Sequence, residues 1–339
     1  MNFKKIFLSL SIVLLAFSTK AQDIHFSQME FSPLTLNPAL AGVNNDMQGI
    51  VNYRNQWRAL GDPFSTIAAS FEKKFKQENN NRKGFLGVGV NFFNDRAGSP
   101  SMTSTNAALN ISYHVFFDDR NTFGAGIYTG FGQRSFNPAD GKWGNQFDGA
   151  NFDPTLGSGE NFATERFAFF DIGGGVLYTF TKDDRIRSMR DHVKITAGGA
   201  FYHGNRPNYS FINRTDENLP MRYSIFANAE ISLENSNLNF MPGVYYQLQG
   251  TAQELLFGSY VGYYLNDDVE SVTNIAMGVF YRNSDAVVIK SYLQWENYTF
   301  GLAYDVNVSS LTEVSRNRGG VEFFLRYAIN NAGASKSRI

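Results

Sequence analysis

Apolar and polar residues alternate along many segments of this chain from residue 47 onward. In residues 86–92, every even-numbered position is apolar, and every odd-numbered position is glycine or asparagine. The same alternation recurs in residues 107–115, 123–131, 298–308 and 321–329, and it keeps charged residues off one face of each segment. A period of two predicts β-strands with one apolar face. Each segment is about as long as a tilted strand that crosses a bilayer, roughly 9 to 11 residues.

Fourteen segments of this kind can be counted, and an even number suits a closed antiparallel barrel. Their predicted starts lie near residues 48, 64, 85, 103, 121, 169, 192, 222, 238, 254, 272, 286, 297 and 319. The sequence therefore predicts an all-β fold, a transmembrane antiparallel β-barrel of the outer-membrane type with 14 strands over residues 47–330.

A soluble β-sandwich would show the same alternation, so the lengths of the connections have to decide between the two folds. If the barrel begins in the periplasm, the two long connections, residues 134–168 and 203–221, both fall on the outer side. The inner connections include 117–120 and 266–271, which are short and rich in Asp and Asn, the residues of tight turns. Long outer loops and short periplasmic turns are typical of outer-membrane barrels, whereas a sandwich does not sort its loops in this way.

The first 21 residues have the features of a secretory signal peptide. Lys4 and Lys5 precede the apolar run 6–17, and the small residues Thr19 and Ala21 precede a cleavage site. We expect residues 1–21 to be removed and the mature chain to begin at Gln22. The apolar run is too short for an ordinary membrane-spanning helix.

Residues 22–46 show neither helical nor strand periodicity, and they contain Pro33 and Pro38. A disordered N-terminus is one interpretation. The segment is rich in apolar residues for a solvated tail, namely Phe26, Met29, Phe31, Leu34, Leu36 and Leu40. We therefore predict a plug-like segment over residues 22–46, held in or under the barrel, and a C-terminal tail over residues 331–339.

Composition limits the chemistry of the chain. It has no cysteine, which excludes disulfides and thiolate metal sites, and its formal net charge of −1 gives no basic surface for nucleic acid. His114 with Asp118, or His203 with Asp216 and Glu217, are conceivable acid and base pairs, but no serine nucleophile motif accompanies them. We expect no enzymatic activity, no cofactor and no metal site.

The inward faces of the predicted strands carry charges of both signs. They include Asp171, Lys194, Arg222, Glu230, Lys290, Glu322 and Arg326. Mixed signs favour pairs that fill a narrow lumen over an ion-selective pore. Glycines such as Gly124 and Gly126 alternate on one face of a strand, where they leave space in the lumen or let a plug approach the wall.

Several motifs resemble the PorP/SprF family of outer-membrane proteins, which belong to the type IX secretion and gliding machinery of Bacteroidota. They lie at residues 22–28, 37–42 (Asn-Pro-Ala-Leu-Ala-Gly), 52–57 (Asn-Tyr-Arg-Asn-Gln-Trp), 94–98 and 301–311. The resemblance runs through nearly the whole mature chain. One departure is the loop 309–318, where residues 316–321 replace an expected Gly-Gly-Ser-His pattern.

The resemblance implies a non-enzymatic component of the outer membrane that assists export or surface anchoring of secreted proteins. The implied partners are outer-membrane lipid and either an adhesin with a C-terminal sorting domain or other type IX secretion components. Both chain termini are expected in the periplasm. The alternative is an outer-membrane transporter of the FadL type, which carries hydrophobic small molecules. Such a transporter needs an apolar lumen, whereas the inward faces considered above are polar and glycine-rich. A simple porin is a third interpretation.

Two groups of residues are candidates for contact with a partner or for plugging the lumen. Asn37, Pro38, Arg54 and Trp57 belong to the motifs near the N-terminus and are expected to brace the strands or close the lumen. The long loop 134–168 carries the second group: Phe136, Trp143, Phe147, Phe152 and Phe162. These aromatic residues are expected either to meet a partner or to fold over the barrel mouth as a lid. Whether a partner is met outside the cell or in the periplasm stays open at this point.

Overall fold

The computed structural model describes most of the chain, and everything below refers to that part. It covers residues 23–56, 63–76, 83–98, 101–149, 151–160, 162–183, 192–212, 214–233, 236–268, 271–309, 312 and 316–330. The predicted signal peptide, Trp57 and the predicted C-terminal tail lie outside the described residues.

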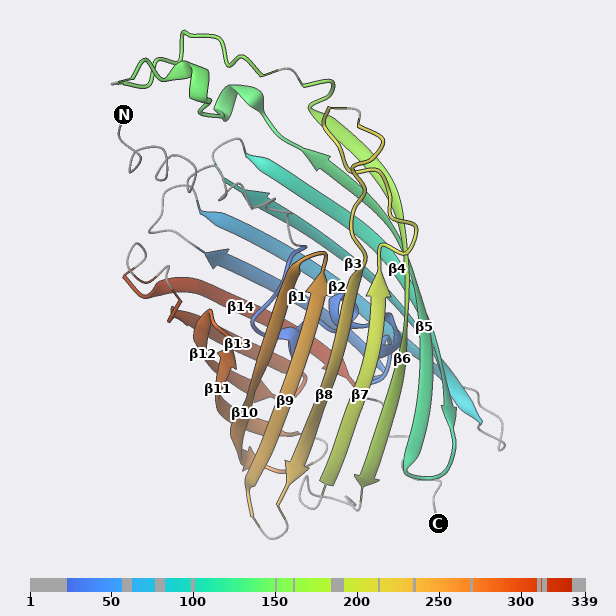
Figure 1. Cartoon of the computed structure of the whole chain (residues 1–339). Helices are drawn as coiled ribbons and strands as arrows, with labels where there is room; N and C mark the ends of the chain where they lie inside the picture. The colour runs from blue at the N-terminus through green and yellow to red at the C-terminus, as the bar shows by residue number, and fades with distance from the viewer. Residues whose placement is uncertain are drawn as a thin grey trace, which may run out of the picture.

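Fourteen antiparallel strands close into one barrel in sequence order, with the last strand paired to the first (Figure 1). They are β1 (Met47–Gln56), β2 (Phe64–Lys76), β3 (Gly84–Ala97), β4 (Met102–Phe116), β5 (Asn121–Ser135), β6 (Arg166–Asp183), β7 (His192–Tyr202), β8 (Arg222–Ser232), β9 (Leu238–Gln249), β10 (Ala252–Asn266), β11 (Thr273–Arg282), β12 (Ala286–Trp295), β13 (Tyr298–Asn307) and β14 (Arg318–Ile329). The predicted fold class and strand number are confirmed, and each strand begins within three residues of its predicted start.

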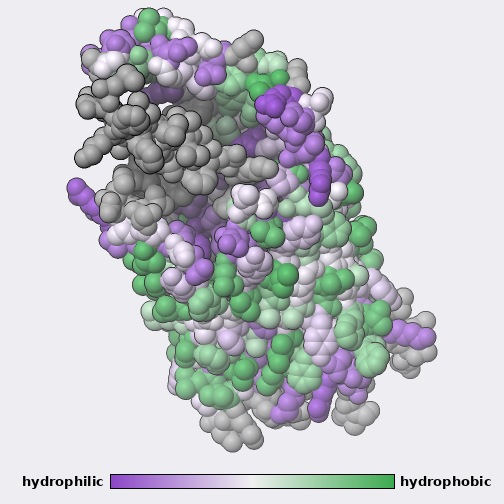
Figure 2. All heavy atoms as spheres, in the orientation of Figure 1, coloured by the Kyte–Doolittle hydropathy of each residue, from purple (hydrophilic) through white to green (hydrophobic). Residues whose placement is uncertain are grey.

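The alternation in sequence corresponds to the two faces of the barrel wall. Val90 and Ile127 point outward and are 49% and 62% exposed, whereas their neighbours Asn91 and Tyr128 are buried on the lumen side. Apolar residues form much of the outer surface in Figure 2. An apolar outer face and a polar inner face are what lipid on one side and a filled lumen on the other require. No helix in the described residues is long and apolar enough to cross a membrane.

The two ends of the barrel differ in their connections. Residues 136–165 join β5 to β6 and residues 203–221 join β7 to β8, both at one end, which we call the long-loop end. The opposite end, the short-turn end, includes the tight turn 117–120, and there Met47 pairs with Ile329. The distribution of loop lengths expected from the sequence is present.

Residues 23–46, which we call the plug, lie inside the barrel (Figure 1). They form three short helical turns, η1 (Met29–Phe31), α2 (Pro33–Leu36) and η2 (Pro38–Leu40). Pro33 and Pro38 each occupy the start of a turn, where the missing N–H costs nothing. Proline therefore ends one turn and begins the next, which keeps the segment irregular.

The plug runs from one end of the barrel to the other. Asp23 lies at the long-loop end, where its main-chain N–H donates to Gln249 Oε1 at 2.8 Å. At the short-turn end Asn330 Nδ2 donates to Asn45 Oδ1 at 3.0 Å. The plug therefore passes through the whole lumen before β1 begins. The two chain termini, which were expected in the periplasm, lie outside the described residues.

Candidate functional site

Side chains of the barrel wall bind the main chain of the plug. A segment without regular structure leaves its N–H and C=O groups unpaired, and inside a barrel these groups need partners. Polar side chains of the strands bond to nine main-chain groups of the described plug, namely the N–H groups of Asp23, Ser27, Gln28 and Gly42 and the carbonyls of Phe31, Leu34, Thr35, Ala41 and Val43. The wall therefore holds the path of the plug largely independently of its side chains.

Five buried residues form an ionic network between the plug and the wall, the Arg54 network: Ser27, Arg54, Arg282, Asp305 and Glu322. Arg54 lies between two carboxylates, at 2.8 Å from Asp305 and 3.0 Å from Glu322. Glu322 accepts the N–H of Ser27 at 2.7 Å, and Asp305 accepts the Ser27 hydroxyl at 2.8 Å. Each buried charge thus has a charged partner and a bond to the plug, which is the condition for burying ions without a large penalty.

A second charged contact lies further along the plug. Lys290 Nζ, which is fully buried, lies 3.2 Å from Glu30, and the hydroxyl of Tyr260 also donates to Glu30. The mixed charges expected in the lumen are therefore present. Some of them pair across strands, as Arg54 and Glu322 do, and others pair with the plug.

Asp23, at the start of the described plug, pairs with His203. The Asp23 carboxylate lies 2.6 Å from His203 Nε2 and 3.4 Å from Arg222, and His203 Nδ1 lies 2.8 Å from Asp171. Burial alone would lower the pKa of His203, but Asp23 and Asp171 outweigh burial and raise it to about 9. Burial likewise opposes the ionised form of Asp23, yet His203 and Arg222 hold the pKa of Asp23 well below its usual value.

Asn37 attaches the middle of the plug to the wall. Its Oδ1 caps η2 by accepting the N–H of Ala39 at 2.8 Å. Its Nδ2 donates to the carbonyls of Val176 on β6 and Gly199 on β7, at 3.0 and 3.2 Å. Pro38, which follows, is buried at the first position of η2.

Glycines of the wall make this close approach possible. A Cβ atom at Gly175 would lie 2.1 Å from Asn37 Oδ1, and one at Gly126 would lie 2.5 Å from the N atom of Ala39. A Cβ atom at Gly87 would lie 2.0 Å from the carbonyl oxygen of Ala41. These glycines therefore do what the sequence suggested, since they let the plug approach the wall.

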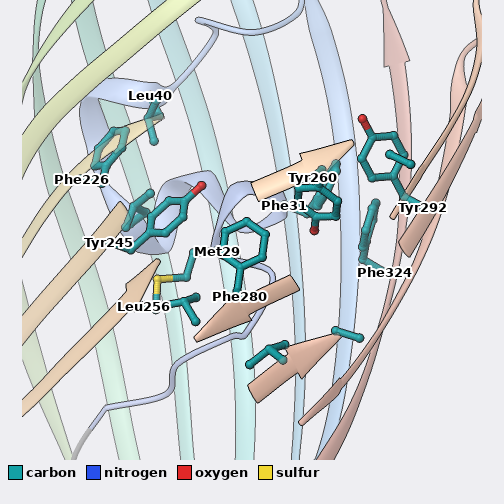
Figure 3. Packing of buried hydrophobic residues seen from close by; sticks show 14 of the residues in the cluster. Met29, Phe31, Leu40, Phe226, Tyr245, Leu256, Tyr260, Phe280, Tyr292 and Phe324 are labelled. Carbon is teal, nitrogen blue, oxygen red and sulfur yellow. The ribbon is translucent and has the colours of Figure 1, made fainter. Parts of the chain in front are cut away.

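Apolar side chains of the plug pack against inward-facing aromatic residues (Figure 3). Phe31 stacks on Phe324 with ring centroids 3.8 Å apart and meets Tyr292 edge-on at 5.6 Å. Further wall residues of this cluster include Leu177, Phe226, Tyr245, Leu256, Tyr260, Phe280 and Val288. The expectation of a polar, glycine-rich lumen was therefore wrong for this part of the wall, where the inward residues match the apolar side of the plug.

The connection 136–165, which we call the arm, is built around aromatic residues at its base. Phe136 is buried and packs edge-on against Phe162 and Phe211, each at 4.6 Å. Trp143 packs on Phe162 at 5.3 Å and donates its indole N–H to the carbonyl of Pro138. These three aromatic candidates therefore hold the arm together and join it to the connection 203–221.

Phe147 and Phe152 lie further out on the arm. They pair across an isolated β-bridge and are 55% and 40% exposed, and Leu156 nearby is 42% exposed. The sequence had placed all five aromatic residues of the loop in one candidate surface. The structure separates them into a packed base and an exposed apolar tip.

Neither conceivable acid and base pair forms. His114 is buried against Phe85 and contacts Ser112, whereas Asp118 accepts hydrogen bonds from main-chain N–H groups of its own turn. His203 lies against Asp23 and Asp171. Asp216, which the sequence placed near it, bonds to Arg214 in the exposed part of the loop.

The sequence identified several residues of the lumen, but it did not show which of them contact one another. Arg54 was selected from its motif, and Glu322 and Lys290 from their inward faces. Ser27, Glu30 and Arg282 were not selected as site residues. The signal that could have found Arg282 is a charge on the lumen-facing position of a strand.

This arrangement can hold a polypeptide in a closed lumen. Among the described residues, no cluster of three His, Asp or Glu side chains is positioned to bind a metal ion. The chemistry present is recognition of main-chain groups, pairing of buried charges and packing of aromatic rings.

Comparisons with solved structures find other barrels at low similarity. A FadL homologue of Pseudomonas aeruginosa has 11% sequence identity and a TM-score of 0.45, with 86% of this chain and 91% of that chain covered. A mutant of the monoaromatic hydrocarbon channel TodX has 10% identity and a TM-score of 0.42, with 88% and 94% covered. BamA from Haemophilus ducreyi, lacking POTRA domains 1–3, has 7% identity and a TM-score of 0.40, with 84% and 70% covered. These similarities are too low to support an argument about function.

Curated protein sequences give no match to this chain. A sequence profile of the type IX secretion system membrane proteins PorP/SprF matches residues 18–327, and so includes the plug and nearly the whole barrel. The closed barrel with an apolar outer face and this match both indicate a protein of the outer membrane. The chain therefore belongs to the PorP/SprF family of type IX secretion system membrane proteins.

Proposed function

We propose that this chain is a non-enzymatic part of the secretion machinery that assists export or surface anchoring of a secreted protein, such as an adhesin with a C-terminal sorting domain. The proposed client meets it at the cell surface. In this proposal the long-loop end faces outward and the short-turn end faces the periplasm, as in outer-membrane barrels generally.

The main support is that the lumen is filled by the chain's own plug. The plug spans the barrel from Asp23 to Asp46 and is fixed by the Arg54 network, the ion pair of Glu30 with Lys290 and an apolar cluster. A cavity between the plug and the wall, next to Asp23, His203 and Arg222, has a volume of about 30 Å³, enough for a water molecule. A filled lumen favours the role of a surface platform over that of an open porin.

The arm supports contact with a client. Its base is ordered by Phe136, Trp143 and Phe162, and its tip presents Phe147 and Phe152 to solvent. Exposed aromatic residues on an ordered support are typical of binding surfaces. The roles of Asn37, Pro38 and Arg54 are, in this proposal, to keep the lumen closed.

Deleting residues 138–160 tests this proposal. The N–H of Phe136 donates to the carbonyl of Glu165 at 3.1 Å and closes the base, so the shortened loop should still connect β5 to β6. The expected result is an assembled barrel that no longer retains its surface protein during affinity purification from native outer membrane. A double variant, Phe147→Ser with Phe152→Ser, should have the same effect with less change to the chain.

Phe117→Ser provides the matched control. Phe117 is 78% exposed in the turn 117–120, so its substitution removes an even more accessible aromatic ring at the short-turn end. If the control abolishes co-purification and the arm variants do not, the contact is on the short-turn side. A role with periplasmic secretion components would then replace the proposed one.

The transporter alternative has one observation in its favour, the aromatic cluster in the lumen. This cluster is occupied by Met29, Phe31, Leu36 and Leu40 of the plug. A hydrophobic substrate would have to displace these side chains, so the proposed function does not rely on transport. Detergent or fatty acid bound at Phe324 in an experimental structure would reverse this preference.

A further inference from the structure

The first half of β6 lacks a strand on one side. β6 pairs with β5 from Arg166, opposite Ser135, to Phe180, but it pairs with β7 only from Gly174, opposite Phe201. The main-chain N–H of Gly204 also donates to the carbonyl of Ile172 at 2.9 Å. Residues 166–171 are therefore a sheet edge about 20 Å long at a strand rise of 3.3 Å per residue. The edge leads directly from the arm.

The β7–β8 connection forms no strand ladder along residues 166–171 and bonds to β6 only through Gly204 and Asn205. His203 and Arg206 have φ of 58° and 43°, and Pro207 follows, so the chain leaves the strand conformation directly after Tyr202. A non-glycine residue with positive φ and a proline both stop a ladder. The absence of a partner strand is thus encoded in the turn after β7.

One side chain stands in for the absent strand. Asn205 Nδ2 donates to the carbonyl of Phe170 at 2.7 Å, and Asn205 Oδ1 accepts the N–H of Ile172 at 3.3 Å. The side-chain amide therefore makes the two bonds that a peptide group of a paired strand would make. Because ladder bonds alternate along a strand, the N–H and C=O of Ala168 point to the same side of β6 as those of Phe170 and Ile172. Among the described residues, nothing bonds to these two groups or to the N–H of Phe170.

The outward face of this edge is apolar and accessible. Phe170 and Ile172 are 57% and 41% exposed, and Ala168 is exposed as well. Phe170 also forms one wall of a groove of about 660 Å³ on the outer face of β2–β6, together with Phe92 and Phe131. A strand added to the edge would place alternate side chains next to Phe170 and the groove, so these side chains should be apolar.

We propose that residues 167–171 of β6 bind an extended segment of a partner polypeptide as an added strand, with apolar residues at alternate positions. The proposal rests on the proposed function, since the segment is assigned to the surface client, and it specifies how that client is bound. Addition of a strand to an open edge gives affinity through main-chain bonds, and the outward side chains give specificity.

Other occupants fit less well. A lipid chain fills the groove but cannot pair with the N–H and C=O of Ala168. A second copy in the same membrane would present its β6 from the opposite side. With strands tilted by about 35–45° to the membrane normal, the two facing strands would cross at about 70–90° and could not form a ladder.

The test uses photocrosslinking side chains introduced into the full-length chain in its native membrane, at Ala168 and at Phe170 in separate variants. Mass spectrometry then identifies the crosslinked residue. We expect both positions to react with one partner segment, at residues two apart in the order of an antiparallel or parallel strand. A crosslinker at Ala125, which is exposed on the fully paired strand β5, is the matched control and should not give this product.

A second pair of variants tests the main-chain bonds. Ala168→Pro removes the N–H that faces the open edge and leaves the ladder with β5 intact, whereas Ala168→Val keeps the N–H. The proline variant should reduce crosslinking from position 170 about tenfold, as expected for the loss of one or two hydrogen bonds. The valine variant should not reduce it, and both should assemble.

Crosslinks to residues 203–221 of the same chain, to a second copy, to lipid alone or to nothing would each overturn the proposal. So would equal crosslinking in the proline and valine variants. The arm deletion can abolish retention of the surface protein while positions 168 and 170 give no crosslinks two residues apart. In that case the added strand is wrong and the proposed function still holds. If the crosslinks two residues apart are found in a protein that is not exposed at the cell surface, the edge is a binding site and the proposed function fails.

Discussion

Arg54 contacts two carboxylates and the hydroxyl of Ser27 in the plug. Its removal should therefore loosen the attachment of the plug to the wall. Arg54→Ala leaves Asp305 and Glu322 buried next to each other with one partner fewer. Breaking a buried pair typically costs about 3–5 kcal/mol. We expect the variant to assemble in lower yield and to conduct ions in planar bilayers more than the parent protein does.

The matched control combines Arg54→Ala with Glu322→Gln. This double variant removes one negative charge together with the positive one, so part of the lost stability should return. A single variant that stays closed and stable would show that the Arg54 network does not hold the plug.

His203 and Asp23 make the start of the plug sensitive to pH. The pKa of His203 is raised from 6.5 to about 9, so its contribution is complete below about 6.5 and is lost as pH rises through about 9. The pKa of Asp23 is lowered from 3.8, so its contribution is present above 3.8 and is lost only in stronger acid. The start of the plug should be held best between about pH 4 and 6.5.

The measurement uses the absence of cysteine in the chain. A nitroxide label on Ile24→Cys should become more mobile between pH 7 and 10. In a His203→Gln background its mobility should change little over that range. The same transition in both proteins would assign it to another group.

At the scale of elements, two adjacent glycines of β7 provide a matched pair of variants. A Cβ atom at Gly198 would lie 2.7 Å from the carbonyl oxygen of Val176 and 2.9 Å from Asn37 Nδ2, whereas one at Gly199 meets its nearest atom at 3.7 Å. Gly198→Ala should therefore displace Asn37 and loosen the plug, and Gly199→Ala should not. Protease sensitivity of the plug in the assembled barrel would measure the difference, and equal sensitivity would contradict the assignment.

The facing of the strands can be tested by placing a charge in the outer belt. Ile127→Arg puts a cation on the lipid side of β5, where Ile127 is 62% exposed, at a cost of about 2–4 kcal/mol near the bilayer midplane. Phe117→Arg, in the exposed turn 117–120, is the control and should assemble normally. The amount of heat-modifiable barrel on a denaturing gel gives the readout, and equal loss from both variants would contradict the facing.

β6 shows where strand prediction from alternation reaches its limit. The sequence placed its start near residue 169, but the strand begins at Arg166. Phe167, Phe169 and Phe170 are apolar on both faces, so the period of two disappears there. The structure explains this pattern, because Phe167 and Phe169 pack against Tyr209 on the inner side while Phe170 faces outward.

At the scale of the whole molecule, the plug connects the long-loop end of the barrel to the short-turn end. Its described start lies among the long connections, and its end leads into β1 at the short turns. A client that binds the arm or the edge of β6 would therefore be close to Asp23 and His203. This proximity offers a physical route by which binding at the surface could affect closure of the lumen.

The number, order and facing of the strands followed from the sequence by itself, because the period of two is local and lipid requires one apolar face on every strand. The glycines that receive the plug were also recognisable, since they interrupt lumen faces where side chains would otherwise stand. The partners in the lumen were decided only by the tertiary structure. Arg54 and Glu322 are 268 residues apart and meet because the barrel closes β1 on β14. The open edge of β6 likewise depends on where β7 stops, which no pattern within β6 reveals.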